Sequence, residues 1–366
     1  MNMTNFKNFE GDFALDAASK ISRDQYEKSI SNAQKTGLTA SEGINDPNIT
    51  TFVRGGSPSY AGLSTFLRSP FLEDVNEVSK YDVAFVGAPF DAGTTFRPGT
   101  RFGPEAMRQI SKLYRTYHFE AGIDLAESIS MCDLGDIYSI HNLEKHNAQL
   151  EKALHHIISN GVFPVVLGGD HSIAYGTLRG VAKAIEGKVG VIQLDRHLDM
   201  QPSEMDEKMH DTPLFHASKL PNIDGKNIVQ IGIGGWQNDV KGSIETKKNG
   251  NTILTMADVD EYGIAKIAEI ALEKAWADGV KAVYLTVDID SVDSGISMGT
   301  GWPEPGGFLP REILQLVKKL AEPGLIGMEL VEVSPPYDHH NQTALMGTRI
   351  ICDTLSSLVV NKRLGK

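Results

Sequence analysis

The sequence predicts an α/β protein of three layers, in which a mainly parallel central sheet lies between two layers of helices. Six apolar runs rich in Val, Ile and Leu end at Gly, Pro or Asp, and amphipathic segments of helical length separate them. Strands that are apolar on both faces are typical of parallel sheets covered by helices on each side. The chain has 366 residues, 41% of them hydrophobic, which suits one large α/β domain.

The predicted elements alternate along the chain from about Tyr81. We expect strands over 81–89, 163–169, 189–195, 227–235, 282–290 and 325–335. We expect helices over 104–115, 147–161, 174–187, 264–279, 310–322 and 343–360. Pro104 suits the first turn of a helix, and Gly161 follows the end of another. Right-handed crossovers between parallel strands then distribute the helices over the sheet.

Residues 1–75 differ from the rest of the chain. They are polar, rich in Ser, Asn, Thr and Asp, and they carry turn signals at Asp46-Pro47 and from Gly55 to Pro58. We interpret this segment as an N-terminal extension of irregular structure and short helices, which serves as an arm on a neighbouring subunit. Residues 76–366 then form the folded domain.

Charge and composition exclude several classes of protein. The 35 Lys and Arg against 47 Asp and Glu give a net charge of −12, and no basic block occurs. We therefore expect neither nucleic acid nor an anionic membrane surface as a partner. The two cysteines, Cys132 and Cys352, lack the spacing of a thiolate zinc site. No apolar run approaches ~18 residues and no signal sequence begins the chain, so we expect a cytoplasmic protein without a membrane span.

Two histidines and four aspartates follow three of the predicted strands: His171, Asp195, His197, Asp199, Asp288 and Asp290. Ligands bind beyond the carboxyl ends of strands in such sheets, and alternate residues of an extended chain share a face, so we expect these side chains to converge. Four converging carboxylates would repel one another, and two divalent cations would neutralise them. Imidazole with carboxylate suits manganese, nickel, iron or zinc. Two such metals can share a water and convert it to hydroxide at neutral pH.

Each of these residues alone has a simpler interpretation. An Asp at a strand end often caps a turn or a helix, and a single buried His is often hydrogen-bonded within the core. Three clusters at three strand ends, with alternate spacing inside them, favour the metal site over six independent structural roles.

The motifs GGDHS, DxHxD and DxDxxD begin at Gly168, Asp195 and Asp288. With the loop GAPFDAGTTFRPGTRFGP and the later VEVSPPYD, they resemble the ureohydrolase superfamily of arginases and agmatinases, from about Tyr81 to the C-terminus. The resemblance implies an arginase-like fold with residues 76–366 as the catalytic domain. It also implies a dinuclear metal centre, usually of manganese, that converts a guanidino group to urea and an amine, and a homo-oligomer, either a trimer or a hexamer.

The resemblance also assigns the metal ligands. One ion would be held by His171, Asp195, Asp199 and Asp288. The other would be held by Asp195, His197, Asp288 and Asp290. Asp195 and Asp288 would therefore bridge the two ions, and Asp290 would also act in catalysis.

Two positions depart from the usual family pattern. Arg196 stands where most relatives have a small Ala, and Ser294 follows Asp293 where they have Pro. With HDTPLFHA, GIGGWQ and GTGWPEPGG, these departures resemble the branch of nickel-dependent guanidine hydrolases. The resemblance favours two nickel ions per subunit, with manganese as the alternative, and it implies a metal-loading chaperone as a partner.

Further residues match positions that handle the substrate and the proton. Glu332 in VEVSPPYD matches a glutamate that binds guanidinium nitrogens, and His210 in MHDTP matches a histidine that shuttles a proton. Trp236, Trp302 and Phe215 lie in loops expected to border the site. Aromatic walls there would leave room for bare guanidinium and provide cation–π contact. Packing alone is the simpler role for a tryptophan in a loop.

The predicted function is therefore the hydrolysis of guanidine to urea and ammonia by a metal-bridging hydroxide, with a small guanidino compound as substrate. The alternative is an agmatinase or a guanidinobutyrase, and the depth of the pocket distinguishes the two. A non-catalytic scaffold or sensor belongs to a different class, which the presence of all six ligands disfavours. The sequence has no GxSxG of a serine hydrolase and no GxGxxG after its first strand.

Overall fold

An eight-stranded sheet forms the centre of the computed structural model, which describes residues 23–55 and 58–365. The strand order is β4-β1-β5-β10-β9-β6-β7-β8, and every neighbouring pair is parallel. The strands are β1 (Val83–Gly87), β4 (Met131–Asp136), β5 (Phe163–Leu167), β6 (Val189–Leu194), β7 (Ile228–Ile233), β8 (Thr252–Thr255), β9 (Ala282–Asp288) and β10 (Gly327–Val331). A separate antiparallel pair joins β2 (Tyr117–His118) to β3 (Ile123–Asp124).

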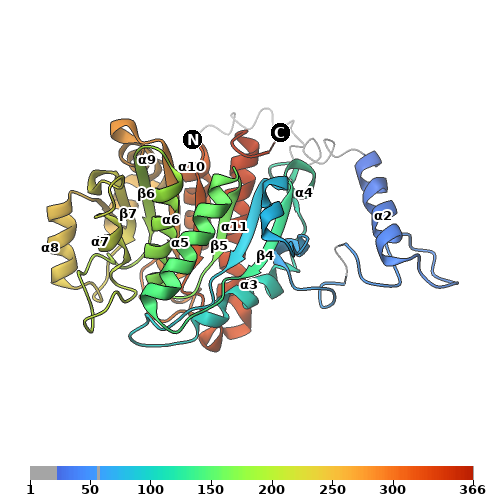
Figure 1. Cartoon of the computed structure of the whole chain (residues 1–366), viewed down its shortest axis with the longest axis horizontal. Helices are drawn as coiled ribbons and strands as arrows, with labels where there is room; N and C mark the ends of the chain where they lie inside the picture. The colour runs from blue at the N-terminus through green and yellow to red at the C-terminus, as the bar shows by residue number, and fades with distance from the viewer. Residues whose placement is uncertain (1–22, 56–57, 366) are drawn as a thin grey trace, which may run out of the picture.

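Helices cover both faces of the sheet (Figure 1). One layer contains α5 (Leu143–Ser159), α6 (Ala174–Ala184) and α7 (Pro213–Ala217). The other contains α3 (Gly103–Ser111), α9 (Met256–Ala275), α10 (Pro310–Ala321) and α11 (Gln342–Val360). The short α4 (Leu125–Ser128) follows β3, and α8 (Val240–Asn249) lies at one end of the molecule.

Two hydrophobic cores account for the layering. Along β1, Val83 and Phe85 point into the core shared with α9, α10 and α11, whereas Ala84 and Val86 point into the core shared with α5 and α6. Alternation along a strand therefore places apolar side chains on both faces, as a parallel sheet between helices requires. The predicted three-layer α/β/α fold is confirmed.

Two strands of the central sheet were not predicted because their sequences lack a long apolar run. β4 reads MCDLGD, and its burial falls off along the strand toward Asp136. β8 has only four residues, TILT, and it pairs with β7 alone at the opposite edge of the sheet. Each is an edge strand, which is less apolar than the central strands on which the prediction depended. The sheet consequently has eight strands rather than six.

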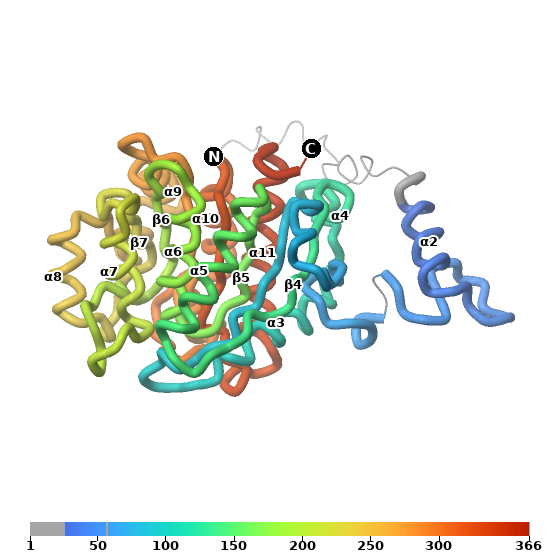
Figure 2. Tube along the Cα trace, viewed as in Figure 1, coloured from blue at the N-terminus to red at the C-terminus, as the bar shows by residue number. Residues whose placement is uncertain are grey.

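The N-terminal extension contains a longer helix than expected. α2 (Arg23–Gly37) lies at the opposite end of the molecule from α8 (Figure 2). Residues 1–22 of the predicted extension lie outside the described residues. From Phe66 onward the chain already packs on the domain, because the buried Phe66 ring lies 4.5 Å from that of Phe85. Part of the segment before residue 76 therefore belongs to the body of the fold.

The segment His339–Val360, which includes α11, is long and apolar enough to cross a membrane by length and composition. In the structure 72% of its most apolar stretch is buried inside the fold. Packing against the sheet, α10 and α3 explains this apolar character.

Candidate metal centre and active site

The predicted ligands gather at the carboxyl ends of the central strands. β5, β10, β9 and β6 lie side by side in that order. The strand before His171 is therefore not the direct neighbour of β6, since β10 and β9 lie between them. The side chains nevertheless reach across these two strands and meet.

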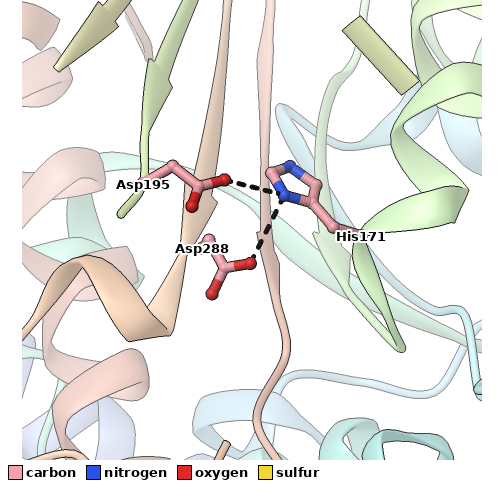
Figure 3. Close-up of side chains that lie close together, drawn as sticks. All are labelled: His171, Asp195 and Asp288. Carbon is pink, nitrogen blue, oxygen red and sulfur yellow. Dashed lines mark ion pairs between the residues drawn. The ribbon is translucent and has the colours of Figure 1, made fainter. Parts of the chain in front are cut away.

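His171 forms the first metal-binding group. Its Nδ1 lies 3.0 Å from Asp195 Oδ2, 2.8 Å from Asp199 Oδ2 and 3.3 Å from Asp288 Oδ2. Figure 3 shows the Asp195 and Asp288 carboxylates converging on this nitrogen. All four side chains are buried, so the nitrogen and the oxygens face one small enclosed space.

His197 forms the second metal-binding group. Its Nδ1 lies 3.0 Å from Asp290 Oδ2 and 3.5 Å from Asp195 Oδ1. Asp195 thus turns one oxygen toward each histidine, and it is the residue shared by the two groups. This geometry suits Asp195 as a bridging ligand. The bridging role of Asp288 stays a prediction, since only the first group includes it.

Tight turns, and not extended chain, bring these residues together. β6 ends at Leu194, the His197 amide donates to Asp195 Oδ1 at 2.6 Å, and Asp199 has a left-handed backbone with φ of 50°. After β9, the Asp290 amide donates to Asp288 Oδ1 at 2.8 Å in a short 3₁₀ turn. The expected convergence is present, but the predicted sharing of a face along extended chain is wrong.

Both histidines are oriented by groups behind them. His171 Nε2 lies 2.9 Å from Thr286 Oγ1, and His197 Nε2 lies 3.0 Å from Gln237 Oε1. Each contact suits a proton on Nε2 and leaves the Nδ1 lone pair directed at the carboxylates, as in most histidine metal ligands. Among the described residues, His171 Nδ1 has no hydrogen-bond partner although it is buried.

The charges of the two groups also suit divalent cations. Burial, followed by repulsion from Asp290 and Asp195, raises the pKa of Asp288 well above its ordinary value. Burial likewise raises the pKa of Asp290 to about 6, against the attraction of His197. Cations between the carboxylates would remove this repulsion and occupy the space that His171 Nδ1 faces. The residues present therefore fit two metal ions.

Glu332 and His210 form a pair beside the metal-binding groups. Glu332 Oε1 accepts a hydrogen bond from the His171 amide at 2.9 Å and lies 3.1 Å from His210 Nδ1. His210 Nε2 lies 3.0 Å from Thr95 Oγ1. Burial lowers the pKa of His210, but the contact with Glu332 outweighs it and raises the pKa to about 9. His210 can therefore hold a proton at neutral pH.

The second oxygen of Glu332 is unused. Oε2 is buried and has no hydrogen-bond partner among the described residues. The residue also has a left-handed backbone, with φ of 64°, which costs of order 1–3 kcal/mol for a side chain of this type. A buried carboxylate oxygen without a donor can receive the N–H group of a cation.

A cavity of about 360 Å³ opens over these groups. Its wall is formed by Thr95, His171, His197, Leu198, Asp199, Met200, Gln201, Glu204, His210, Asp211, Trp236, Gln237, Asn238, Asp239, Gly242, Asp288, Asp290, Trp302 and Glu332. The Trp302 ring lies 6.4 Å from the His197 ring and 6.2 Å from the His210 ring. Phe96 packs edge-on against the same indole at 5.6 Å. Trp302 therefore lies next to a histidine of the second metal-binding group and next to the Glu332–His210 pair.

The other two predicted aromatic residues are placed differently. The Trp236 side chain is 97% exposed, so it contributes only to the rim of the cavity. Phe215 packs against the core next to α6 and α7 and against His216, and it is not part of the cavity wall. For Trp236 the prediction of an aromatic wall failed because a loop position in the sequence does not tell which way an aromatic ring points. For Phe215 it failed because this residue lies within α7 and not in a loop.

Sequence reasoning missed the groups that hold the histidines. Thr286 precedes Asp288 by two residues on β9, so the alternation of side chains could have indicated it. Gln237 and Thr95 lie in loops, and no local pattern connects them with His197 or His210.

Comparisons with known proteins identify the family of this chain. The model of the Arginase family matches residues 81–356. The guanidinobutyrase of Pseudomonas aeruginosa is 33% identical over 303 residues, which cover 82% of this chain and 94% of that protein. Proclavaminate amidinohydrolase of Streptomyces clavuligerus is 36% identical over 308 residues, again with 82% and 94% covered. The solved structure of that enzyme superposes with a TM-score of 0.75 over 83% of this chain and 100% of its own. The chain therefore belongs to the arginase family, as a ureohydrolase with a pair of His/Asp metal-binding groups.

Proposed function

We propose that this ureohydrolase acts on guanidine itself and releases urea and ammonia. The observation that supports this proposal is the position of Trp302, whose ring lies against both His197 and His210. We infer that an indole at this place restricts the room for an alkyl tail beside a bound guanidinium group.

The residues of the chain then divide the work. Glu332 Oε2 accepts an N–H of guanidinium in a charge-assisted hydrogen bond and holds its plane. His210, kept protonated by Glu332, gives its proton to the departing nitrogen, so that the leaving group is ammonia. When bound, two divalent cations supply Lewis acidity and a nucleophilic water at neutral pH.

We also propose nickel as the preferred metal, with manganese as the alternative. His171, Asp195, Asp199 and Asp288 would hold one ion, and Asp195, His197, Asp288 and Asp290 the other. Ligand sets of imidazole nitrogen and carboxylate oxygen accommodate both metals, and such sets bind nickel more tightly than manganese. Availability in the cell still decides which metal is loaded.

Agmatine is the second candidate substrate. The names of relatives favour a longer guanidino compound, since they include the guanidinobutyrase of Pseudomonas aeruginosa and the mitochondrial agmatinase of Gallus gallus. Among the described residues of the cavity wall none is Lys or Arg, whereas Glu204, Asp211 and Asp239 add carboxylates. Burial, with repulsion by Glu204, raises the pKa of Asp211 to about 7. Such a wall suits the ammonium of agmatine better than the carboxylate of 4-guanidinobutyrate.

Urea release from guanidine, agmatine, 4-guanidinobutyrate and arginine tests the proposal. The protein is stripped of metal, reconstituted separately with nickel and with manganese, and assayed at equal metal content. We expect guanidine to give the highest kcat/KM, and nickel the more active enzyme. A preference for agmatine would refute the guanidine proposal and establish the second candidate. Asp195→Asn, prepared in parallel, controls for contaminating hydrolases.

A further inference from the structure

Arg196 lies between the ligands Asp195 and His197 in the sequence, and it is not part of the cavity wall. The side chain is buried, with 2% of its surface exposed. Its Nη1 donates to the Gly232 carbonyl at 2.8 Å, and its Nη2 donates to the Pro305 carbonyl at 3.1 Å. One guanidinium group thereby joins the end of β7 and the loop that follows it to a second loop, which contains Pro305 and is far away in the sequence.

The first of these loops is shaped to receive the guanidinium. A Cβ atom built on Gly234 would lie 3.0 Å from Arg196 Nη1 and 3.2 Å from Nη2. Gly232 has a φ of 98°, which other residues rarely adopt. The backbone of this loop therefore approaches the plane of the guanidinium more closely than a side chain would allow.

The second loop carries Trp302. Besides the bond from Arg196 to Pro305, the loop accepts a hydrogen bond at Pro303 O from Gln237 Nε2, at 3.2 Å. Gln237 also holds His197 through its Oε1 at 3.0 Å. Two hydrogen bonds, both to carbonyl groups that closely follow Trp302 in the chain, therefore connect this loop to Arg196 and, through Gln237, to His197.

The guanidinium carries a charge that its own contacts do not neutralise. Among the described residues no ion pair includes Arg196, and its Nε has no hydrogen-bond partner although it is buried. Burying a cation against neutral carbonyl groups is unfavourable for stability. A planar group with several fixed N–H donors is, however, well suited to hold two loops at a defined separation.

We propose that Arg196 is a positioning residue that fixes the loop of Trp302 over the metal centre and so limits the substrate to a small guanidinium. The selectivity half of this inference depends on the proposed guanidine function. The positioning half depends only on the contacts of Arg196 with the two loops.

Two substitutions separate the roles of the group. Arg196→Met keeps most of the volume and removes every donor. Arg196→Lys keeps the charge, but its ammonium cannot donate along the two directions of the planar fork. Arg179→Met is the matched control, because Arg179 is a partly buried arginine on α6 that pairs with Glu144 and Glu151.

The measurements are metal content, kcat and KM for guanidine and agmatine, and fluorine NMR of fluorotryptophan-labelled protein. The chain has three tryptophans, and Trp→Phe variants assign the Trp302 resonance. For Arg196→Met we expect wild-type metal content, a higher KM for guanidine, a ratio of guanidine to agmatine kcat/KM at least about tenfold lower, and a shifted, narrower Trp302 resonance. Arg196→Lys should lie between, and Arg179→Met should match the wild type.

An unchanged Trp302 resonance in both Arg196 variants would overturn the positioning role. A changed resonance with an unchanged substrate ratio would overturn the selectivity role alone. Wild-type enzyme that prefers agmatine would refute the guanidine proposal instead, and the resonance would still decide the positioning role of Arg196. If Arg196→Met does not fold, Arg196→Lys carries the same comparison.

Discussion

Asp195 is the side chain on which both metal-binding groups depend. Its two oxygens face His171 and His197 separately, whereas Asp290 faces His197 alone among the two histidines. The loss of a shared ligand should therefore affect two ions, and the loss of an unshared ligand should affect one.

Substitution with asparagine tests this difference. Asp195→Asn should lose activity and fail to retain two tightly bound metals, while Asp290→Asn should keep about one ion per chain, because only one group loses a charge. Elemental analysis after exhaustive dialysis measures the metal content. Asp260→Asn, at an exposed position, is the control. Two tightly held ions in Asp195→Asn would show that Asp195 is not a bridging ligand.

Replacement of His210 tests its proposed role as the proton donor. His210→Asn keeps a polar side chain near Thr95 and Glu332 but cannot transfer a proton. We expect kcat to fall by about 10²–10⁴, as for the loss of a general acid, with metal content unchanged. Steady-state urea release and elemental analysis are the measurements. His141→Asn, at an exposed site, should behave as wild type. Near-native kcat in His210→Asn would leave His210 with a structural role only.

The ligands could be predicted from the sequence because each follows a strongly apolar run that ends abruptly. The aromatic wall could not, since the direction of a loop side chain depends on contacts with other loops. Trp302 is held between Phe96 and two histidines, while Trp236, from a similar loop, faces solvent. Arg196 likewise stood out as a residue type, but its role needed the positions of Gly232 and Pro305.

The short connection between β5, which ends at Leu167, and the turn at His171 requires a glycine at position 169. A Cβ atom at Gly169 would lie 1.9 Å from the Phe90 carbonyl oxygen, so alanine would force the link to move. We expect Gly169→Ala to lower the free energy of unfolding by about 1–3 kcal/mol or more. Gly242 on α8 has no neighbour closer than 3.8 Å to such an atom, and Gly242→Ala should stabilise by about 0.5–1 kcal/mol. Urea unfolding of both variants measures the sign of each change in the free energy of unfolding. Equal changes in the two variants would contradict the steric role of Gly169.

α5 contains a histidine that should make the fold sensitive to acid. His146 is fully buried, its ring stacks on Phe90 at 4.2 Å, and neither ring nitrogen has a hydrogen-bond partner among the described residues. Burial lowers the pKa of His146 from 6.5 to about 4. In the unfolded chain His146 therefore binds a proton below about pH 6.5, whereas in the folded chain it binds one only below about pH 4. Neutral His146 therefore costs the fold nothing above about pH 6.5, and its titration removes about 3 kcal/mol of stability as the pH falls to 4.

His146→Phe removes this proton and preserves the stacking on Phe90. We expect the metal-free variant to lose less stability than metal-free wild type between pH 7.5 and pH 4.5. Urea midpoints at the two pH values give the comparison. His141→Phe, at an exposed position, should keep the pH dependence of the wild type. Identical pH dependence in His146→Phe and wild type would exclude His146 as its cause.

The alternation of central strands and helices along the chain could be predicted from the sequence, whereas the total number of helices and strands could not. Central strands such as β9 are buried along their whole length, which gives the unbroken apolar run that a pattern search detects. β8 is short and borders the sheet, and α2 and α8 have few apolar residues, so neither periodicity nor composition indicated them. Neighbour relations in the sheet, such as β10 lying between β5 and β9, are not written in any local pattern.

At the scale of the whole molecule, the extension gives a prediction about assembly. α2 lies at the opposite end of the molecule from α8, whose Gly242 lines the cavity, and the segment after α2 leaves Leu38 and Phe52 exposed, each by 58%. If the extension is an arm on a second subunit, as the sequence predicts, deletion of residues 1–54 should leave the domain folded and lower the mass of the assembly. Light scattering coupled to gel filtration measures the mass, and the thermal midpoint controls for folding. An unchanged mass would show that assembly does not depend on the arm.

The metal centre draws on residues from His171 to Asp290, and its neighbour Glu332 comes later still. During synthesis on a ribosome, the first of these residues emerges long before the last, and no fragment that ends ahead of β9 contains both groups. Sites of this kind rarely exist before folding. Assembly of both complete metal-binding groups therefore requires synthesis of the chain beyond Asp290. A truncated chain that ends before β9 should therefore contain neither complete group, although it contains His171, Asp195 and His197.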